Sequence, residues 1–145
     1  MDLVGSDLFV GTLDDATDSH RLEEDEITTV VSLTHETPDL SEPALNIHSI
    51  PLIDGPQNNR DQFTKAVQAT VTALADGERV LVHCAAGASR SPTVAATALA
   101  LTEEMELQNA IQQVADNRDA VDPHEALLRQ AAHVYTELSD SASLN

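Results

Sequence analysis

Aromatic residues are nearly absent from this sequence. Its 145 residues include Phe9, Phe63 and Tyr135 but no tryptophan. The hydrophobic fraction is nevertheless 41%, which is ordinary for a folded protein and argues against intrinsic disorder. The core is therefore expected to consist of valine, leucine, isoleucine and many alanines, within a single domain that spans residues 1–145.

Positive charge is also scarce. Lysine and arginine number 7 against 25 aspartates and glutamates, the formal net charge is −18, and Lys65 is the sole lysine. Such a charge repels nucleic acids and anionic membranes, so neither is an expected partner. Self-repulsion also destabilises the compact chain, unless about 1 M salt shortens the Debye length to about 3 Å. The composition resembles that of halophilic archaeal proteins; a merely acidic mesophilic protein is the alternative.

Cysteine occurs once, at Cys84, so no disulfide can form within the chain and a reducing compartment is indicated. The first seven residues lack the basic and apolar segments of a signal peptide. The most apolar run, residues 94–101, is too short to cross a bilayer. The expected location is therefore the cytoplasm. Because the histidines other than His83 show no metal-ligand spacing, no metal and no other cofactor is expected.

The residue pattern predicts an α/β fold. β-branched residues, alternation or a continuous apolar run predict four strands: residues 8–10, 28–33, 46–50 and 80–82. Helical spacing of apolar residues predicts four longer helices: residues 61–76, 92–104, 107–117 and 123–138. A short surface helix is expected within residues 14–26, and a proline-containing loop at residues 37–43. Strands that alternate with helices, followed by helices only, predict a mostly parallel, twisted sheet of about four to five strands flanked by helices.

One stretch combines a nucleophile, small residues and a cation. His83 and Cys84 follow the last predicted strand, and five residues separate Cys84 from Arg90. A helix N-terminus and a nearby guanidinium both stabilise a thiolate. Loop amides at the start of a helix form a nest for an anion, to which arginine adds a planar, bidentate clamp. Gly87 is free to adopt a positive φ. The predicted cradle consists of Ala85, Ala86, Gly87, Ala88 and Ser89.

Hydrolysis of a phosphate monoester also requires an acid for the leaving oxygen. Asp54 ends an apolar segment and begins a Gly-Pro loop. Because the loops after parallel strands meet at one edge of a sheet, Asp54 is expected near Cys84. Asp39 and Asp61 are the rival carboxylates, but neither directly follows a predicted strand. Ser91 is expected to hydrogen-bond the sulfur or to cap the helix, and capping would not exclude the bond to the sulfur.

The run from His83 to Thr93, His-Cys-Ala-Ala-Gly-Ala-Ser-Arg-Ser-Pro-Thr, resembles the signature of the cysteine-based dual-specificity protein phosphatases. Residues 8–11, 27–33 and 105–110, together with Arg118, resemble other parts of the family pattern. The resemblance therefore extends over nearly the whole chain. It implies metal-free hydrolysis of phosphotyrosine and phosphoserine or phosphothreonine in a phosphorylated protein, in two steps through a cysteinyl-phosphate.

The resemblance also implies a role for each matching residue. Cys84 is the nucleophile, Arg90 the phosphate clamp, Asp54 the acid and then the base, and Ser91 the hydroxyl partner of the sulfur. His83 orients the loop from beneath. The loop lacks the lysines that phosphoinositide-preferring relatives carry, which disfavours a lipid substrate.

Two other kinds of protein are consistent with such a loop. A rhodanese-type sulfurtransferase also places a cysteine loop beside an arginine, but typically with four residues between them rather than five. A non-catalytic phosphate-binding module would be expected to have lost Cys84 or Asp54, and both are present. The sequence therefore favours a phosphoric monoester hydrolase.

Overall fold

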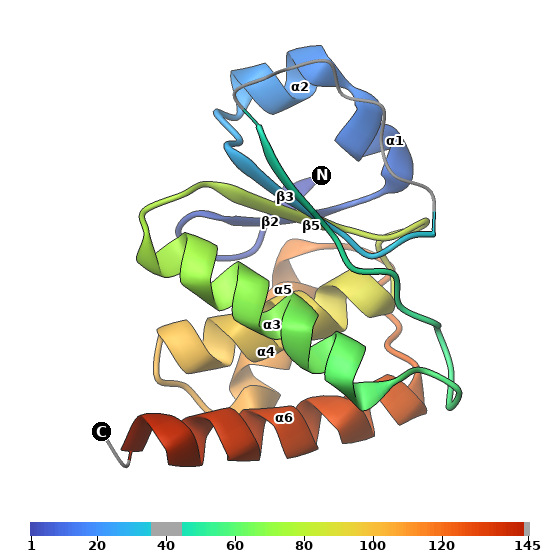
Figure 1. Cartoon of the computed structure of the whole chain (residues 1–145). Coiled ribbons are helices and arrows are strands. Elements are labelled where there is room, and N and C mark those ends of the chain that lie inside the picture. Colours follow the sequence, from blue (N-terminus) through green and yellow to red (C-terminus); the bar gives the residue numbers. More distant parts are fainter. Residues whose placement is uncertain (36–44, 144–145) are drawn as a thin grey trace.

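A computed structural model describes residues 1–35 and 45–143 of the chain and shows one twisted sheet between two layers of helices (Figure 1). The strands are β1 (Asp2–Leu3), β2 (Leu8–Gly11), β3 (Thr29–Ser32), β4 (Asn46–Ser49) and β5 (Val80–His83). Their order in the sheet is β1-β2-β5-β3-β4, and only β1 is antiparallel to its neighbour. The predicted α/β fold with a mostly parallel sheet is thus confirmed. The loop expected at residues 37–43, which includes Asp39, lies outside the described residues.

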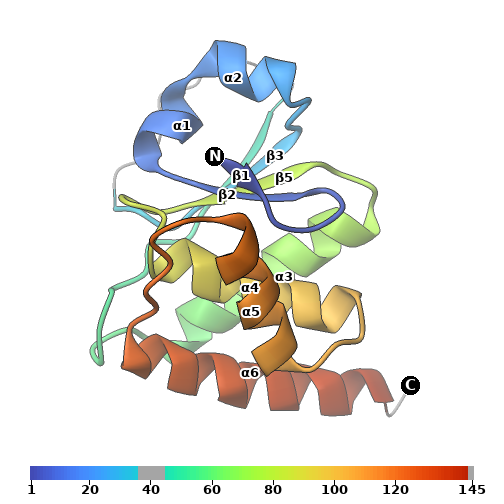
Figure 2. The ribbon, with the colours of Figure 1, turned by 180° about the vertical axis from the view of Figure 1, so that it is seen from behind.

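Two short helices cover one face of the sheet and four longer helices cover the other (Figures 1 and 2). The short pair is α1 (Leu13–Thr17) and α2 (Ser19–Glu24). The longer helices are α3 (Arg60–Ala75), α4 (Arg90–Thr102), α5 (Leu107–Asn117) and α6 (Glu125–Ser143). The first three end within two residues of their predicted C-terminal bounds, whereas α6 continues five residues beyond the predicted end at 138. Two short helices form where one is expected within residues 14–26. The chain breaks at Asp18, whose carboxylate caps α2 by accepting a hydrogen bond from the Arg21 amide at 3.2 Å.

Alternation along the strands divides the core into two clusters. Val80 and Val82 belong to the large cluster beneath the four longer helices. Leu81, which lies between them, belongs to a smaller cluster with Leu22 and Ile27 on the α1–α2 side. Successive strand side chains point to opposite faces, so a strand covered on both sides must be apolar throughout. This explains the continuous apolar run that predicts β5.

Helix α4 forms the centre of the larger layer, where it packs against α3, α5 and α6. Every residue from Ser91 to Ala100 is buried. Most of these side chains are small, so neighbouring helices approach closely without aromatic residues. The buried hydroxyls of Thr93 and Thr97 donate to the carbonyls of Ser89 and Thr93, at 2.7 and 2.8 Å, which satisfies both groups.

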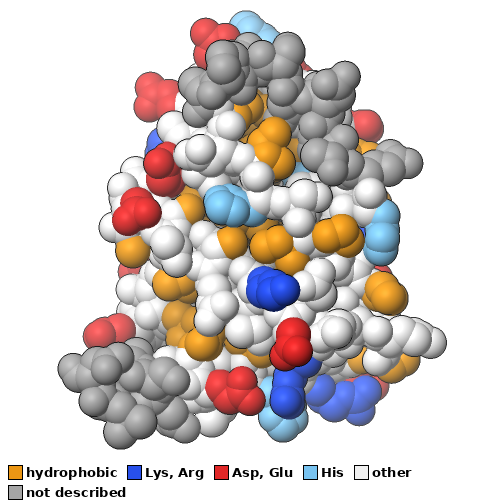
Figure 3. All heavy atoms as spheres, viewed as in Figure 1, with side chains coloured by type: hydrophobic (Ala, Val, Ile, Leu, Met, Phe, Trp, Pro, Cys, Tyr) orange, Lys and Arg blue, Asp and Glu red, His pale blue; other side chains and the backbone are white. Residues whose placement is uncertain are grey.

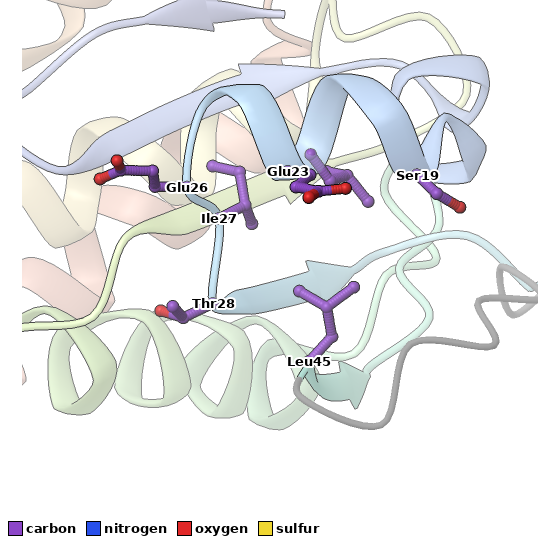
Figure 4. A pocket seen from close by; sticks show the side chains of 7 residues that line it. Ser19, Glu23, Glu26, Ile27, Thr28 and Leu45 are labelled. Carbon is purple, nitrogen blue, oxygen red and sulfur yellow. The ribbon is translucent and has the colours of Figure 1, made fainter.

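The α1–α2 side retains an apolar hollow of about 240 Å³, whose lining includes Ile27, Thr28 and Leu45 (Figure 4). Thr28 and Leu45 directly precede β3 and β4. The hollow therefore lies at the N-terminal ends of these strands, opposite the edge at which the predicted site lies. In the described part of the chain, no helix combines the length and hydropathy needed to span a membrane.

Candidate active site

The predicted site lies where β5 ends and α4 begins. β5 ends at His83, and residues 84–90, which we call the cysteine loop, lead into the first turn of α4. Cys84 is buried, with 2% of its surface exposed, whereas Ala85 and Ala86 are exposed. Gly87 adopts a φ of 66°, as predicted. The sulfur thus lies at the bottom of a loop that is open to the surface.

The backbone of the cysteine loop is held from outside. Four successive carbonyls of the loop accept hydrogen bonds from donors outside it. The Leu13 amide donates to the Ala85 carbonyl at 3.4 Å, and the Asp122 amide donates to the Ala88 carbonyl at 2.7 Å. Arg118 donates to the carbonyls of Ala86 at 3.3 Å and Gly87 at 2.8 Å. By contrast, the amides of residues 85–90 donate no hydrogen bond within residues 1–35 and 45–143. A run of free amides at a helix N-terminus is the arrangement that binds an anion.

Two groups of Ser91 contact the sulfur of Cys84. The Ser91 hydroxyl lies 3.1 Å from Sγ, and the Ser91 amide donates to Sγ at 3.5 Å. Ser91 is completely buried. The alternative that Ser91 caps the helix is wrong, because α4 begins at Arg90 and Ser89 occupies the N-cap position. Ser91 lies in the first turn, where its hydroxyl is directed to the sulfur.

Among the described residues, Arg90 is held through one of its nitrogens. Nη1 donates to the carbonyls of Leu33 at 3.4 Å and Leu52 at 3.1 Å, which follow β3 and β4. Nε and Nη2 have no hydrogen-bond partner among the residues that the structure describes. The anchored guanidinium therefore retains one edge for a bidentate contact with two phosphate oxygens.

Asp54 lies beside the cysteine loop. Its Oδ1 accepts a hydrogen bond of 2.6 Å from the Ser89 hydroxyl, which itself accepts one of 2.8 Å from the His124 amide. The loops after β4 and β5 therefore meet, as the sheet topology predicts. The Asp54 side chain is exposed, so it is accessible to a substrate. The rival Asp61 lies instead in the first turn of α3, where its amide donates to Asn59 Oδ1 at 2.8 Å.

An amide pair, which the sequence did not predict, fixes the segment that carries Asp54. We call residues 53–58 the Asp54 loop. Asn58 is buried and accepts a hydrogen bond of 2.7 Å from the Ile53 amide across this loop. Asn58 Nδ2 donates to Gln130 Oε1 at 2.9 Å, and Gln130 Nε2 donates to the Asn58 carbonyl at 2.6 Å. The Asp54 loop is therefore bound at its base to α6.

Arg118 supports the cysteine loop from behind, a role that the sequence also did not predict. Besides the two loop carbonyls, its guanidinium contacts Asp2 Oδ2 at 2.9 Å. A Cβ at Gly87 would collide with the Arg118 guanidinium and would approach the Gly11 carbonyl oxygen to 2.9 Å. Glycine at this position therefore serves both the positive φ and the close approach of Arg118.

His83 lies beneath the loop as a completely buried side chain. Neither ring nitrogen has a hydrogen-bond partner within the described part of the chain. Burial lowers the pKa of His83 to about 4, and the positive charge of Arg90 acts in the same direction. The imidazole is thus neutral near pH 7 and packs beneath the loop.

Comparison with known proteins identifies the family. Residues 8–137 match the family described as "Dual specificity phosphatase, catalytic domain", and the chain belongs to this family. The site is therefore that of a cysteine-based phosphatase rather than a rhodanese-type sulfurtransferase.

Similar proteins include Protein phosphatase Slingshot homolog of Xenopus laevis, 28% identical over 85% of this chain and 18% of the relative. Dual specificity protein phosphatase 14 of Mus musculus is 28% identical over 97% of this chain and 72% of the relative. The first curated relatives are longer, and the chain spans between 18% and 67% of their length. The crystal structure of human DUSP28 has the same fold, with a TM-score of 0.88 and 22% identity over 97% of this chain and 99% of that chain.

Proposed function

We propose that this protein hydrolyses phosphotyrosine and phosphoserine or phosphothreonine monoesters of phosphorylated proteins through a cysteinyl-phosphate. The observation that carries the proposal is the way in which the backbone of the cysteine loop is hydrogen-bonded. Its carbonyls accept hydrogen bonds from residues outside the loop, whereas the amides of residues 85–90 have no partner among the described residues. A tetrahedral dianion fits such a nest, with the free edge of Arg90 against two of its oxygens.

In the first step, the Cys84 thiolate attacks phosphorus and the bond from phosphorus to the leaving oxygen breaks. The loop amides and Arg90 stabilise the charge on the equatorial oxygens. Asp54 donates its proton to the leaving oxygen, so that an alcohol or phenol departs. Its position beside Ser89, at the rim of the cysteine loop, suits this role.

In the second step, water attacks the cysteinyl-phosphate while Asp54, now ionised, accepts a proton from it. The phosphorus–sulfur bond breaks, inorganic phosphate leaves, and the sulfur departs as a thiolate. The Ser91 hydroxyl, 3.1 Å from Sγ, donates to the developing negative charge. No oxidant, reductant or further cofactor takes part in either step.

Replacement of Cys84 and Asp54 tests the proposal. Cys84→Ser is expected to abolish turnover of p-nitrophenyl phosphate and of phosphotyrosine and phosphothreonine peptides while peptide binding persists. Asp54→Asn is expected to slow turnover by roughly 10²–10⁴, and less for esters with good leaving groups. Asp76→Asn, an exposed carboxylate at the end of α3, serves as the matched control. Full activity of Cys84→Ser, or an equal loss for good and poor leaving groups in Asp54→Asn, would refute these roles.

Broad substrate use is part of the proposal. Ala85 and Ala86 are exposed, and the described Asp54 loop contains no long insertion, so both features support a shallow cleft. A shallow cleft lets the short side chains of phosphoserine and phosphothreonine reach the sulfur as well as phosphotyrosine. Turnover of all three phosphopeptides by the same preparation tests this breadth.

We also propose a cytoplasmic protein that works at high salt without nucleic acid or membrane as a partner. The lone cysteine supports a reducing compartment, because its thiol has to remain free to react. The net charge of −18 supports the salt requirement and disfavours nucleic acids and anionic membranes as partners.

A further inference from the structure

A second hollow lies next to the Asp54 loop. It has a volume of about 470 Å³ and is bounded by that loop, the first turn of α3 and one side of α6. Its lining includes Pro56, which is two residues from Asp54, and several polar side chains: Asn58, Arg60, Asp61, Arg129, Gln130 and His133. We call it the α3–α6 hollow. It therefore adjoins the segment that carries the proposed acid.

The charge of this hollow differs from that of the chain as a whole. Two of the 7 lysines and arginines, Arg60 and Arg129, lie here beside His133. Two carboxylates accompany them: Asp61 in the lining, and Glu125, which contacts Arg129. Figure 3 shows two blue side chains against a pale blue one at the lower edge of the molecule, over the beginnings of α3 and α6. In a protein with a net charge of −18, a region whose charges nearly balance repels an anion less than the rest of the surface does.

Neither guanidinium group is tightly held by the described part of the chain. Arg60 makes no ion pair or side-chain hydrogen bond with any residue that the structure describes. Arg129 contacts Glu125 at 3.9 Å, but both side chains are exposed, so this pair is weak and readily exchanged. Arg60 is the first residue of α3, a helix of 16 residues, and the positive N-terminal end of this helix would favour an anion bound there.

The base of the hollow is rigid. The reciprocal hydrogen bonds between Asn58 and Gln130, of 2.6 and 2.9 Å, fix the Asp54 loop to α6 on the side where Arg129 and His133 lie. Arg60 follows Asp54 by six residues, so their Cα atoms are at most about 20 Å apart. An extended substrate segment of about six residues is therefore long enough to reach from the sulfur side of Asp54 to Arg60.

We infer that the α3–α6 hollow is a second anion subsite, which binds a carboxylate or a second phosphate on the substrate within about six residues of the phosphorylated side chain. This inference rests on the proposed function and adds substrate selectivity to it. Guanidinium groups suit either anion, because their planar fork matches the oxygens of both. The subsite thus directs an acidic protein towards acidic or doubly phosphorylated segments, which its overall charge would otherwise repel.

Peptide selectivity tests the subsite. Values of kcat/KM are measured for a phosphotyrosine peptide with neutral flanks, the same peptide with aspartate and glutamate flanks, and one with a second phosphothreonine. For Arg60→Gln, Arg129→Gln and the double variant, we expect the ratio of acidic to neutral peptide to fall, by roughly 3- to 30-fold in the double variant. Arg21→Gln, an exposed arginine on α2, is the control that removes the same charge elsewhere.

The outcomes separate this inference from the proposed function. A wild-type protein that does not prefer either anionic peptide overturns the subsite. The subsite is also overturned if the ratio of acidic to neutral peptide falls no further in Arg60→Gln and Arg129→Gln than in Arg21→Gln. A preference for the doubly phosphorylated peptide alone identifies phosphate, and an equal preference for both identifies negative charge in general. Absence of p-nitrophenyl phosphate turnover contradicts the proposed function instead. In that case, binding of the three peptides to the Cys84→Ser protein, measured by fluorescence anisotropy, still decides the subsite.

Discussion

Removal of the Ser91 hydroxyl tests the second step of the proposed reaction. The hydroxyl lies 3.1 Å from the Cys84 sulfur and is completely buried, so solvent does not readily replace it in Ser91→Ala. A hydrogen bond to a charged group contributes about 1.5–3 kcal/mol. Because the sulfur gains negative charge when the cysteinyl-phosphate breaks down, that step is expected to slow by about 10- to 150-fold. The Ser91 amide, 3.5 Å from Sγ, remains to support the attacking thiolate.

Pre-steady-state kinetics with p-nitrophenyl phosphate distinguishes the two steps. If Ser91→Ala slows only the second step, p-nitrophenol is released in a stoichiometric burst and then slowly, and phosphate is trapped on Cys84. Thr97→Val is the matched control, because it removes a buried hydroxyl of the same helix that bonds only a backbone carbonyl. A Ser91→Ala protein with wild-type turnover would refute the reasoning. So would slow turnover without a burst, since the hydroxyl would then act on the first step.

Three further predictions concern the surroundings of the loop. Because the pKa of His83 is lowered to about 4 from 6.5, its neutral form stabilises the fold fully above pH 6.5, and this stability is lost as the pH falls towards 4. Urea unfolding of wild type and His83→Gln should therefore diverge by about 3 kcal/mol over that range; a difference independent of pH contradicts the assignment. Gly87→Ala is expected to lower turnover at least about tenfold and to lower the melting temperature, since it combines a positive φ with a collision against Arg118, and wild-type kinetics would disprove that constraint. Finally, the melting temperature should rise between about 0.1 M and about 2 M KCl, and a fall would refute stabilisation by screening.

The sequence predicted those features that depend on short-range pattern. The apolar run at residues 80–82 and the helical spacing after Arg90 predict β5 and α4 because each depends on neighbouring residues alone. Asp54 and its hydrogen-bond partner Ser89 are 35 residues apart. They were nevertheless associated from the sequence, because the loops that follow parallel strands meet at one edge of a sheet. The two-residue strand β1 was not predicted, because so short a segment shows no periodicity.

The sequence did not predict contacts between side chains that are far apart along the chain. Asn58 and Gln130 are 72 residues apart, and their pairing depends on where α6 packs, which no local pattern encodes. Arg118 matches the family pattern, but a basic residue after a helix end has no particular partner in the sequence, so its contact with Gly87 was not predicted. The sequence assigned Ser89 to the cradle and gave no sign that its hydroxyl donates a hydrogen bond to Asp54.

The outside support of the cysteine loop has a consequence for how the chain tolerates change. Three of the four bonded loop carbonyls depend on Arg118 and Asp122, which lie far along the chain from Cys84. The nest is shaped when the chain folds, so substrate binding requires little rearrangement of the backbone. Evolution or engineering could therefore change the rate of reaction through the α5–α6 connection while the nucleophile, the clamp and the acid all remain in place.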